Sequence, residues 1–317
     1  MKAVVYAKNG TSVPLAFREV DMPTPKDDEV LIKIYASSIN AADYRLIRMG
    51  MGIPKSGIFG ADIAGRVEDV GKNVTQYKPG DDVVGDLADC GSGGWAEYVV
   101  AKANCVTKKP ANVSYDIAAA VPLAGTTALM ALRDTGNMQP GQKVLINGAG
   151  GGVGTFAVQL AKYFGAEVTA VCSATNADMV RAIGADHVID YALEDFTRSG
   201  IQYDRIIAVN GYHPLSDYKK SLKPTGIYVM VGGTFPQIFK SIFFGPWMSM
   251  GGRKMRVQNA KSNTTDVAFL MDLVAAGKIR PVIDRRYPLG ETPEAYRYVN
   301  EGHPRGKVVI TVVEVKK

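Results

Sequence analysis

Five glycines stand within the seven residues Gly148–Gly154 (GAGGGVG), between a β-type run, Lys143–Asn147, and an amphipathic run, Val153–Phe164. Glycine costs roughly 0.5–1 kcal/mol per residue against alanine in regular structure, so this concentration needs a local reason. Small residues at a strand-to-helix turn let backbone N–H groups approach a pyrophosphate, and the helix N-terminus adds about half a positive charge. The pattern predicts a dinucleotide-binding loop rather than an ordinary glycine-rich turn. The residues expected at the phosphates are Gly150, Gly151, Gly152 and Val153.

The preference between NADH and NADPH depends on the residues at the end of the next expected strand, Glu167–Val171. An NAD-specific site usually offers a carboxylate there, which accepts hydrogen bonds from the adenosine ribose. This chain continues with CSATN at Cys172–Asn176 and has no acid to repel a 2′-phosphate. We therefore expect NADPH rather than NADH. The side chains expected to donate to that phosphate, each of which could instead be a solvated loop residue, are Ser173, Thr175, Asn176 and Tyr191.

The glycine loop belongs to a stretch, starting near Val121, in which β-type runs alternate with helical runs. This alternation is typical of βαβ units and a parallel sheet. The expected strands are Lys143–Asn147, Glu167–Val171, His187–Tyr191, Tyr203–Val209, Gly226–Val231 and Lys254–Gln258. The expected helices are Val153–Phe164, Ala177–Ile183 and Leu215–Leu222.

Short β-type runs broken by turn signals fill the first third of the chain and indicate a small, mostly antiparallel domain. They are Lys2–Ala7, Val30–Ile39, Ile63–Val70, Asp82–Val84 and Trp95–Val100, with one helix expected at Ala41–Met49. A β-rich pattern returns near Pro281, and its last run is Lys307–Glu314. Because terminal strands often complete one sheet, we expect residues 1–121 and 264–317 to form one domain, with residues 122–263 inserted as the parallel-sheet domain.

The composition bounds the possible functions. With 317 residues, 46% hydrophobic and 21% charged, the chain has room for two domains with their own cores. The net charge of +6 arises from Lys and Arg that are interleaved with Asp and Glu, so it does not indicate a nucleic-acid surface. No stretch is typical of a signal peptide or a membrane span, and we expect a cytoplasmic protein.

The cysteines and histidines suggest neither cross-links nor a metal site. The three cysteines, Cys90, Cys105 and Cys172, imply no disulfide framework and fit a reducing compartment. The three histidines are scattered and lack ligand spacing to the cysteines.

Several long motifs, ordered along nearly the whole chain, carry a family resemblance. They include SINAADYRLIRMG at Ser38–Gly50, FGADIAGRVEDVG at Phe59–Gly71, KPGDDVVGD at Lys78–Asp86, VPLAGTTAL at Val121–Leu129 and NGAGGGVGTFAVQLAK at Asn147–Lys162. The chain resembles the medium-chain dehydrogenase/reductase superfamily, in its zinc-independent quinone oxidoreductase branch. The resemblance implies an α/β protein in which a GroES-like, mostly antiparallel catalytic domain carries an inserted, doubly wound Rossmann domain, with the active site in the cleft between them.

The chain departs from zinc-dependent relatives at the metal positions. Those relatives hold the catalytic zinc with a cysteine after the second long strand and with a His-Glu pair in the segment matching GADIAG. Here the positions read Asn40, Ala61 and Asp62. An amide is a poor zinc ligand and alanine is none, so we expect no metal. The lobe of four closely spaced cysteines that carries structural zinc is also absent from the sequence.

The resemblance also suggests site residues. Asn40 and Tyr44 line the nicotinamide end in this branch: Asn40 could bind the nicotinamide ribose or the substrate, and Tyr44 could polarise a substrate oxygen, deliver a proton or simply pack. Asp43 is expected to hold its helix by local hydrogen bonding. Thr127 matches a threonine that faces the nicotinamide or phosphates, with a buried helix cap as the alternative. The residues that end the fourth and fifth expected strands, where parallel sheets bind ligands, are Asn210, Gly211, Gly232 and Gly233.

The expected function is NADPH-dependent hydride transfer to quinones or α,β-unsaturated carbonyl compounds, without a metal. The alternatives are a redox-sensing or nucleic-acid-associated NADPH-binding protein with little catalysis, and a zinc-free NADP-dependent alcohol dehydrogenase. The aromatic segment Phe235–Met250 is expected to wall the substrate pocket, to bury itself against a second subunit of a homodimer, or to pack in the core.

Overall fold

The chain folds into two units. The computed structural model describes residues 1–7, 13–209, 213–233, 235–249, 251–259, 261, 263–302 and 304–313. Unit 1 comprises Met1–Thr126 and Lys261–Lys317, and unit 2 comprises Thr127–Ala260. The sequence placed these boundaries at residues 121/122 and 263/264, a few residues away in each case.

Unit 2 is built on a six-stranded parallel sheet with the order β10-β9-β8-β11-β12-β13. Counted from β8 this is the order 3-2-1-4-5-6 of a dinucleotide-binding Rossmann sheet, and the expected fold class is confirmed. The strands are β8 (Lys143–Asn147), β9 (Glu167–Cys172), β10 (His187–Asp190), β11 (Tyr203–Ala208), β12 (Leu222–Met230) and β13 (Lys254–Val257). The helices are α4 (Gly152–Tyr163), α5 (Ala177–Ala182), α6 (Leu215–Lys220) and α7 (Phe235–Met248).

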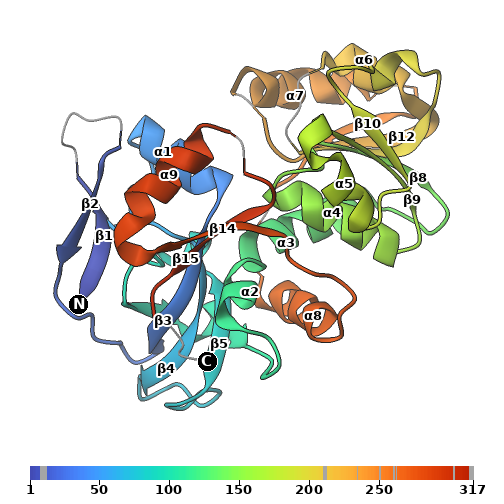
Figure 1. Ribbon diagram of the computed structural model, residues 1–317. Helices are drawn as coiled ribbons and strands as arrows, with labels where there is room; N and C mark the ends of the chain where they lie inside the picture. Colours follow the sequence, from blue (N-terminus) through green and yellow to red (C-terminus); the bar gives the residue numbers. More distant parts are fainter. Residues whose placement is uncertain are drawn as a thin grey trace. The chain divides into compact units, whose positions relative to one another are not determined.

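Unit 1 contains a seven-stranded sheet in which β14-β15-β3-β4-β5-β7 follow one another and β6 also pairs with β3 (Figure 1). All of its pairs are antiparallel except β14–β15. The strands are β3 (Glu29–Ile39), β4 (Asp62–Val70), β5 (Asp82–Asp86), β6 (Tyr98–Lys102), β7 (Val106–Lys108), β14 (Ile283–Pro288) and β15 (Lys307–Thr311), beside the separate hairpin β1 (Lys2–Tyr6) and β2 (Leu15–Glu19). The helices are α1 (Ala41–Met49), α2 (Tyr115–Ala119), α8 (Thr264–Ala275) and α9 (Thr292–Asn300), with α3 (Pro122–Met130) at the boundary of the units.

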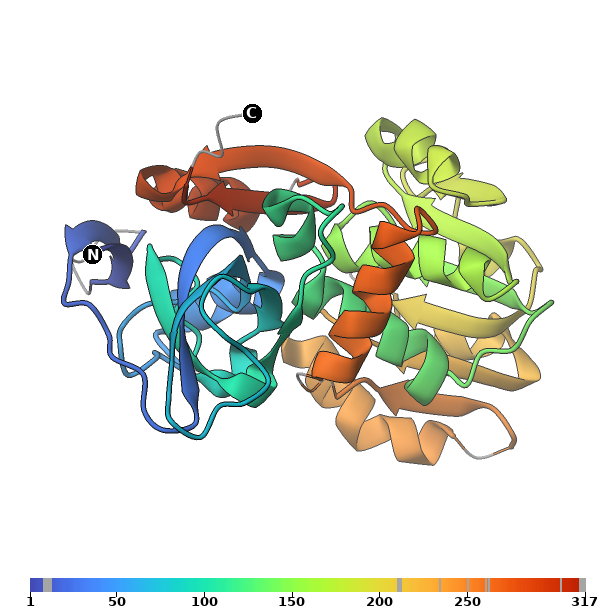
Figure 2. The ribbon, with the colours of Figure 1, turned by 90° about the horizontal axis from the view of Figure 1, so that it is seen from below.

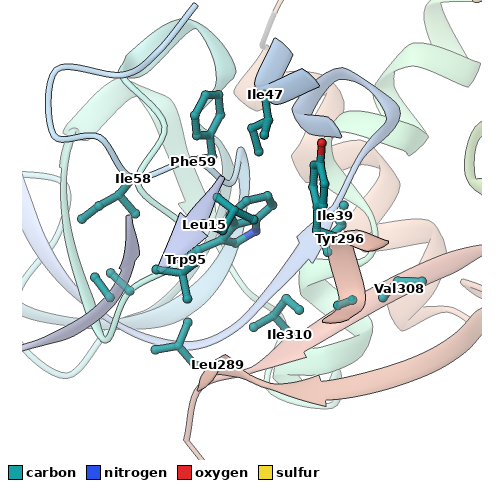
Figure 3. Close-up of a cluster of buried hydrophobic side chains, with 14 of the residues drawn as sticks. Leu15, Ile39, Ile47, Ile58, Phe59, Trp95, Leu289, Tyr296, Val308 and Ile310 are labelled. Carbon is teal, nitrogen blue, oxygen red and sulfur yellow. The ribbon is translucent and has the colours of Figure 1, made fainter. Parts of the chain in front are cut away.

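The two ends of the chain share one hydrophobic core. Strand β15 pairs antiparallel with β3, with Val308 opposite Ile39. Around this pair the fully buried Trp95 packs with side chains from both ends of the sequence (Figure 3). Burial of one such large side chain contributes about 1.5–3 kcal/mol, so the late segment stabilises the early one. The expectation that the first and last segments complete one sheet is confirmed.

Several elements were missed by the sequence patterns. Strand β6 runs over Tyr98–Lys102 instead of Trp95–Val100, because Ala96 forms only an isolated bridge to Ala3. Near Pro281, where only β structure was expected, helix α9 forms with a proline in its first turn. The other helices and strands without a sequence prediction are β2, β7, α2, α3, α7 and α8, whereas β14 falls in the stretch that was expected to be β-rich. Helix α8 has a recognisable signal, since the side chain of Asn263 accepts hydrogen bonds from two backbone N–H groups of its first turn.

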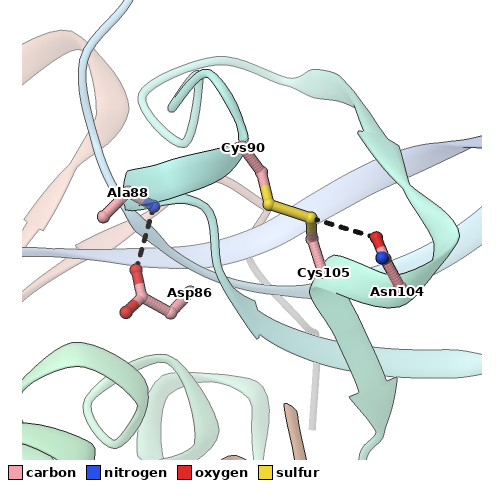
Figure 4. Close-up of a disulfide and its surroundings, with 5 residues drawn as sticks. All are labelled: Asp86, Ala88, Cys90, Asn104 and Cys105. Carbon is pink, nitrogen blue, oxygen red and sulfur yellow. Dashed lines mark hydrogen bonds between the residues drawn. A yellow bond between two sulfur atoms is a disulfide. The ribbon is translucent and has the colours of Figure 1, made fainter. Parts of the chain in front are cut away.

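A disulfide joins Cys90 to Cys105, and the expectation of unpaired cysteines is wrong for these two (Figure 4). Cys90 lies in a short 3₁₀ turn after β5, and Cys105 ends another before β7. Antiparallel pairing of β5 with β7 brings the two turns together, which spacing along the chain does not reveal. Cys172, at the end of β9, is buried and free.

We predict that removing this cross-link lowers stability measurably. The bond closes a loop with a sequence separation of 15 residues, for which the loss of unfolded-state entropy amounts to about 3 kcal/mol. Urea unfolding of Cys90→Ala/Cys105→Ala should show this loss against the oxidised parent. Thiol titration of the denatured, unreduced protein should find one thiol per chain; three would contradict the cross-link.

Candidate functional site

The glycine loop of unit 2 is held in a conformation that only glycine permits at two positions. Gly148 has φ of +92°, in the left-handed region. At Gly154 a Cβ atom would lie 2.1 Å from the carbonyl oxygen of Gly148, so no side chain fits between the loop and the first turn of α4. The backbone is thus folded closely enough for main-chain N–H groups to reach a ligand.

Helix α4 begins at this loop without a side-chain cap. Its N-cap residue, Gly151, has an extended backbone and no side chain to satisfy the first N–H groups of the helix. Gly152 and Val153 are the first helical residues of this 12-residue helix. Uncapped N–H groups and the helix dipole make such a terminus suited to an anion. Gly150 lies against Asn176, since a Cβ there would approach Asn176 Nδ2 to 2.5 Å.

The expected phosphate donors gather after β9. Ser173 Oγ lies 2.9 Å from Thr175 Oγ1, and Asn176 Nδ2 donates to Ser173 Oγ at 3.2 Å. Asn176 Oδ1 is buried and has no partner. Because a buried orphan acceptor is costly, a ligand hydroxyl or N–H group that donates to Asn176 Oδ1 would be stabilised here. Tyr191 is 64% exposed, and its backbone N–H donates to Cys172 O at the end of β9.

The remaining predicted cofactor residues differ in their surroundings. After β12, the N–H groups of Val231 and Gly232 both donate to Ala208 O, which holds the chain that leads to Gly233 against the end of β11. Asn210 and Gly211 lie outside the described residues. Thr127 is buried in the middle of α3, so the alternative of a helix cap is wrong.

A buried polar group in unit 1, here called the Asp62 cluster, comprises Ser38, Asn40, Asp43, Asp62 and Lys307. The carboxylate of Asp62, which is fully buried, accepts four hydrogen bonds. Oδ2 accepts from Ser38 Oγ (2.5 Å), Asn40 Nδ2 (2.8 Å) and Lys307 Nζ (3.1 Å). Oδ1 accepts from the backbone N–H of Leu123 (2.8 Å), in the first turn of α3.

Asn40 has both ends of its side chain engaged. While Nδ2 donates to Asp62, Oδ1 accepts from Lys307 Nζ. Its backbone N–H donates to Asp43 Oδ2 at 2.8 Å, which starts α1 as expected for Asp43, and Gly50 with φ of +62° ends that helix. The sequence did not single out Lys307, which is the first residue of β15.

Tyr44, the predicted proton donor, follows Asp43 on α1. Its half-buried ring packs on the hydrophobic core around Trp95, and the guanidinium carbon of Arg45 lies 5.7 Å from the ring centroid. The ring of Tyr44 therefore packs on the core, which is one of the roles expected for this residue. A separate cavity of about 260 Å³ in unit 1 is lined by the disulfide, Lys102 and the start of α8, and by none of these predicted residues.

Burial raises the pKa of Asp43 from 3.8 to about 7. The nearby charges of Asp62 and Asp86 also raise it, whereas the hydrogen bond from Asn40 and the charge of Lys307 lower it. Burial is the largest of these causes, so the carboxyl keeps its proton in weakly acidic solution.

We predict that Asp43 makes stability fall as pH rises. The unfolded chain releases this proton near pH 3.8 and the folded chain near 7, so the folded state binds more protons between about pH 4 and 7. The free energy of unfolding should therefore decrease with pH by on the order of 1 kcal/mol per unit more than in Asp43→Asn. Urea titrations at several pH values measure both slopes, and equal slopes would contradict the assignment.

Comparisons with known proteins agree with this arrangement. Residues 26–111 match the family model described as the alcohol dehydrogenase GroES-like domain, and residues 183–310 match the model described as zinc-binding dehydrogenase. Among the described residues, no three His, Cys, Asp or Glu side chains gather in a way that could hold a metal ion. No helix in the described part of the chain is long and apolar enough to cross a bilayer.

Several known proteins are similar to this chain over nearly the whole length of both sequences. The chain is 33% identical to the chloroplast envelope quinone oxidoreductase homolog of Arabidopsis thaliana, over 98% of each chain. It is 34% identical to the mitochondrial NAD(P)H oxidoreductase RTN4IP1 of Mus musculus, over 99% of this chain and 89% of that one. The solved quinone oxidoreductase of Coxiella burnetii superposes with a TM-score of 0.87 at 29% identity, over 99% of both chains. The chain therefore belongs to the quinone oxidoreductase branch of the medium-chain dehydrogenase/reductase superfamily and is an oxidoreductase with a nicotinamide cofactor.

Proposed function

We propose that the protein is an NADPH-dependent reductase of quinones or α,β-unsaturated carbonyl compounds. The observation that carries the proposal is the glycine loop of a Rossmann sheet, which leads into an α4 N-terminus without a side-chain cap. The relatives add the reaction class, since their names describe quinone and NAD(P)H oxidoreductases.

The residues of unit 2 fit a dinucleotide. The first N–H groups of α4 would bind the pyrophosphate, because Gly151 has no side chain to cover them and the nearest atom to a Cβ there would be Gly148 O at 4.0 Å. The orphaned Oδ1 of Asn176 would accept a hydrogen bond from a hydroxyl of the adenosine ribose. NADPH is proposed over NADH because β9 ends at Cys172 and is followed by Ser173, where an NAD site places a carboxylate.

The substrate class follows from what the chain must stabilise. A bound reduced nicotinamide supplies hydride, and quinones and enones share an electrophilic carbon conjugated to a carbonyl. Negative charge then grows on the substrate oxygen and needs a preorganised donor. We assign this donor role to the hydroxyl of Tyr44, on a ring that core packing holds in place. Asn40 would assist through the amide proton that does not face Asp62.

We predict NADPH oxidation with at least one member of a panel of quinones and enones, and slower oxidation with NADH. Removal of a single such donor typically costs about 100-fold in turnover, so Tyr44→Phe should lower kcat while the KM for NADPH is kept. Arg48→Gln, an exposed change on the same helix, is the control. Assays of NADPH oxidation across the panel give kcat and KM for Tyr44→Phe and for the control.

The outcomes separate the alternatives. Unchanged turnover of Tyr44→Phe on every accepted substrate would remove Tyr44 from the mechanism. If no member of the panel oxidises NADPH and the protein binds RNA in a salt-sensitive way, the alternative of a nucleic-acid-associated NADPH-binding protein with little catalysis would be favoured. Alcohol oxidation with NADP that persists after chelation would favour the zinc-free alcohol dehydrogenase.

We also propose a homodimer that covers helix α7. One face of α7 carries large apolar side chains that are 54–72% exposed in the single chain: Phe239, Ile242, Phe243 and Trp247. Helix α7 lies along β13, the last strand of the sheet in unit 2 (Figure 2). A two-fold contact between copies would cover both the apolar face and the open strand edge.

We predict a mass of twice 34.0 kDa in solution. Trp247→Glu places a charge in the proposed interface and should yield monomers, because an unpaired buried charge is strongly destabilising. Leu193→Glu changes a side chain of unit 2 that is 84% exposed, away from α7, and should leave the dimer intact. Light scattering after size exclusion distinguishes these species, and a monomeric parent would refute the dimer.

The cytoplasmic location remains a prediction from the sequence. The curated relatives named above are chloroplast and mitochondrial proteins, and the Cys90–Cys105 disulfide is of a kind that persists in oxidising compartments.

A further inference from the structure

A lysine is buried beside a carboxylate in unit 1. Lys307 and Asp62 have side chains that are 2% and 0% exposed, with 3.1 Å between Nζ and Oδ2. Burying an ammonium is strongly unfavourable unless it is paired and hydrogen-bonded. Lys307 meets this condition with two acceptors, Asp62 Oδ2 and Asn40 Oδ1.

The two acceptors occupy positions where zinc-dependent relatives have metal ligands. The third such position, Ala61, is a buried alanine with no ligand atom. A divalent ion at Asn40 and Asp62 would lie next to the ammonium of Lys307, which already uses the oxygens available to a metal. These residues therefore do not fit zinc, although residues 183–310 match the zinc-binding dehydrogenase model.

We propose that the Lys307 ammonium is the built-in cation of this site, which takes the place of a metal ion and holds Asn40 in its working orientation. Lysine only donates hydrogen bonds and a carboxylate only accepts them. The amide of Asn40 must therefore turn Oδ1 to Lys307 and Nδ2 to Asp62, and it cannot flip without losing both bonds. One amide proton of Asn40 remains for a ligand.

Lys307 is thus a positioning residue that acts through Asn40. It comes from the first position of β15, whereas Asn40 follows β3 and Asp62 begins β4. The ammonium therefore fixes the start of α1, which carries Tyr44, against the sheet of unit 1. The positioning of Asn40 by Lys307 rests on the proposed function. The exclusion of a metal ion by Lys307 can be tested without any substrate.

The metal arm restores the ligands of zinc-dependent relatives. Asn40→Cys/Ala61→His supplies a thiolate and an imidazole beside Asp62, and the triple variant adds Lys307→Met. We expect the triple variant to bind one zinc per chain and the double variant to bind it at least about 100-fold more weakly, because two cations then compete for one site. Metal content after dialysis and circular dichroism measure zinc and folding; equal zinc affinity in the two would overturn the proposal.

The kinetic arm separates positioning from stability. Lys307→Met leaves the Asp62 carboxylate without its counter-charge and should lower Tm, whereas Asp62→Asn/Lys307→Met removes both charges and should recover part of the lost Tm. Recovery is partial because an amide accepts at one atom only, whereas the Asp62 carboxylate accepts at both oxygens. With Asn40 no longer fixed, kcat should stay reduced by about 100-fold in both variants, and the KM for NADPH should not change. Lys72→Met, which breaks an exposed ion pair with Asp27, is the control.

Recovery of kcat together with Tm in the charge-balanced variant would show that Lys307 is merely structural and would overturn its positioning role. If Lys307→Met does not fold, the comparison of the charge-balanced variant with the parent decides. If the parent reduces no quinone or enone, the proposed function fails, while the metal arm still tests Lys307.

Discussion

The carboxylate of Asp62 is the point on which the architecture of unit 1 depends. Four donors converge on it, from the end of β3, the residue that follows β3, the start of β15 and the first turn of α3. A buried carboxylate tolerates no missing partner, so these segments must meet in one geometry. Because α1 starts within this group, the position of Tyr44 is set by the same contacts. An ion pair between segments 245 residues apart in sequence joins the first and last parts of the chain.

Unit 2 depends on a different constraint, the close approach of backbone at the glycine loop. The carbonyl oxygen of Gly148 takes up the space that a side chain at Gly154 would need, and this brings the first turn of α4 against the end of β8. The strand order 3-2-1-4-5-6 reverses its direction between β8 and β11, where open parallel sheets bind ligands. Local backbone geometry and global topology thus point to the same binding position.

The sequence predicted what depends on local pattern. The glycine loop and the βαβ alternation follow from periodicity and turn chemistry, and both are present. The shared sheet of the chain ends, which is also present, was expected because terminal strands often complete one sheet. Features that depend on distant partners could not be predicted: Lys307 reads as the start of an ordinary strand until Asp62 lies beside it, and Cys90 reads as a free thiol until β5 and β7 pair. Helix α7 was missed because its segment contains Pro236, Gly245 and Pro246, residue types that usually interrupt a helix. For Tyr44, Asn40 and the cofactor residues the sequence suggested roles that remain proposals.

We propose that a dinucleotide binds at the glycine loop and that Lys307 takes the place of a metal ion. A crystal structure of the protein grown with NADP⁺ and zinc tests it most directly. We expect the pyrophosphate at the N-terminus of α4, with Lys307 Nζ bonded to Asn40 and Asp62. A glycine loop without the dinucleotide, or a zinc ion between Asn40 and Asp62 with Lys307 turned away, would contradict the account.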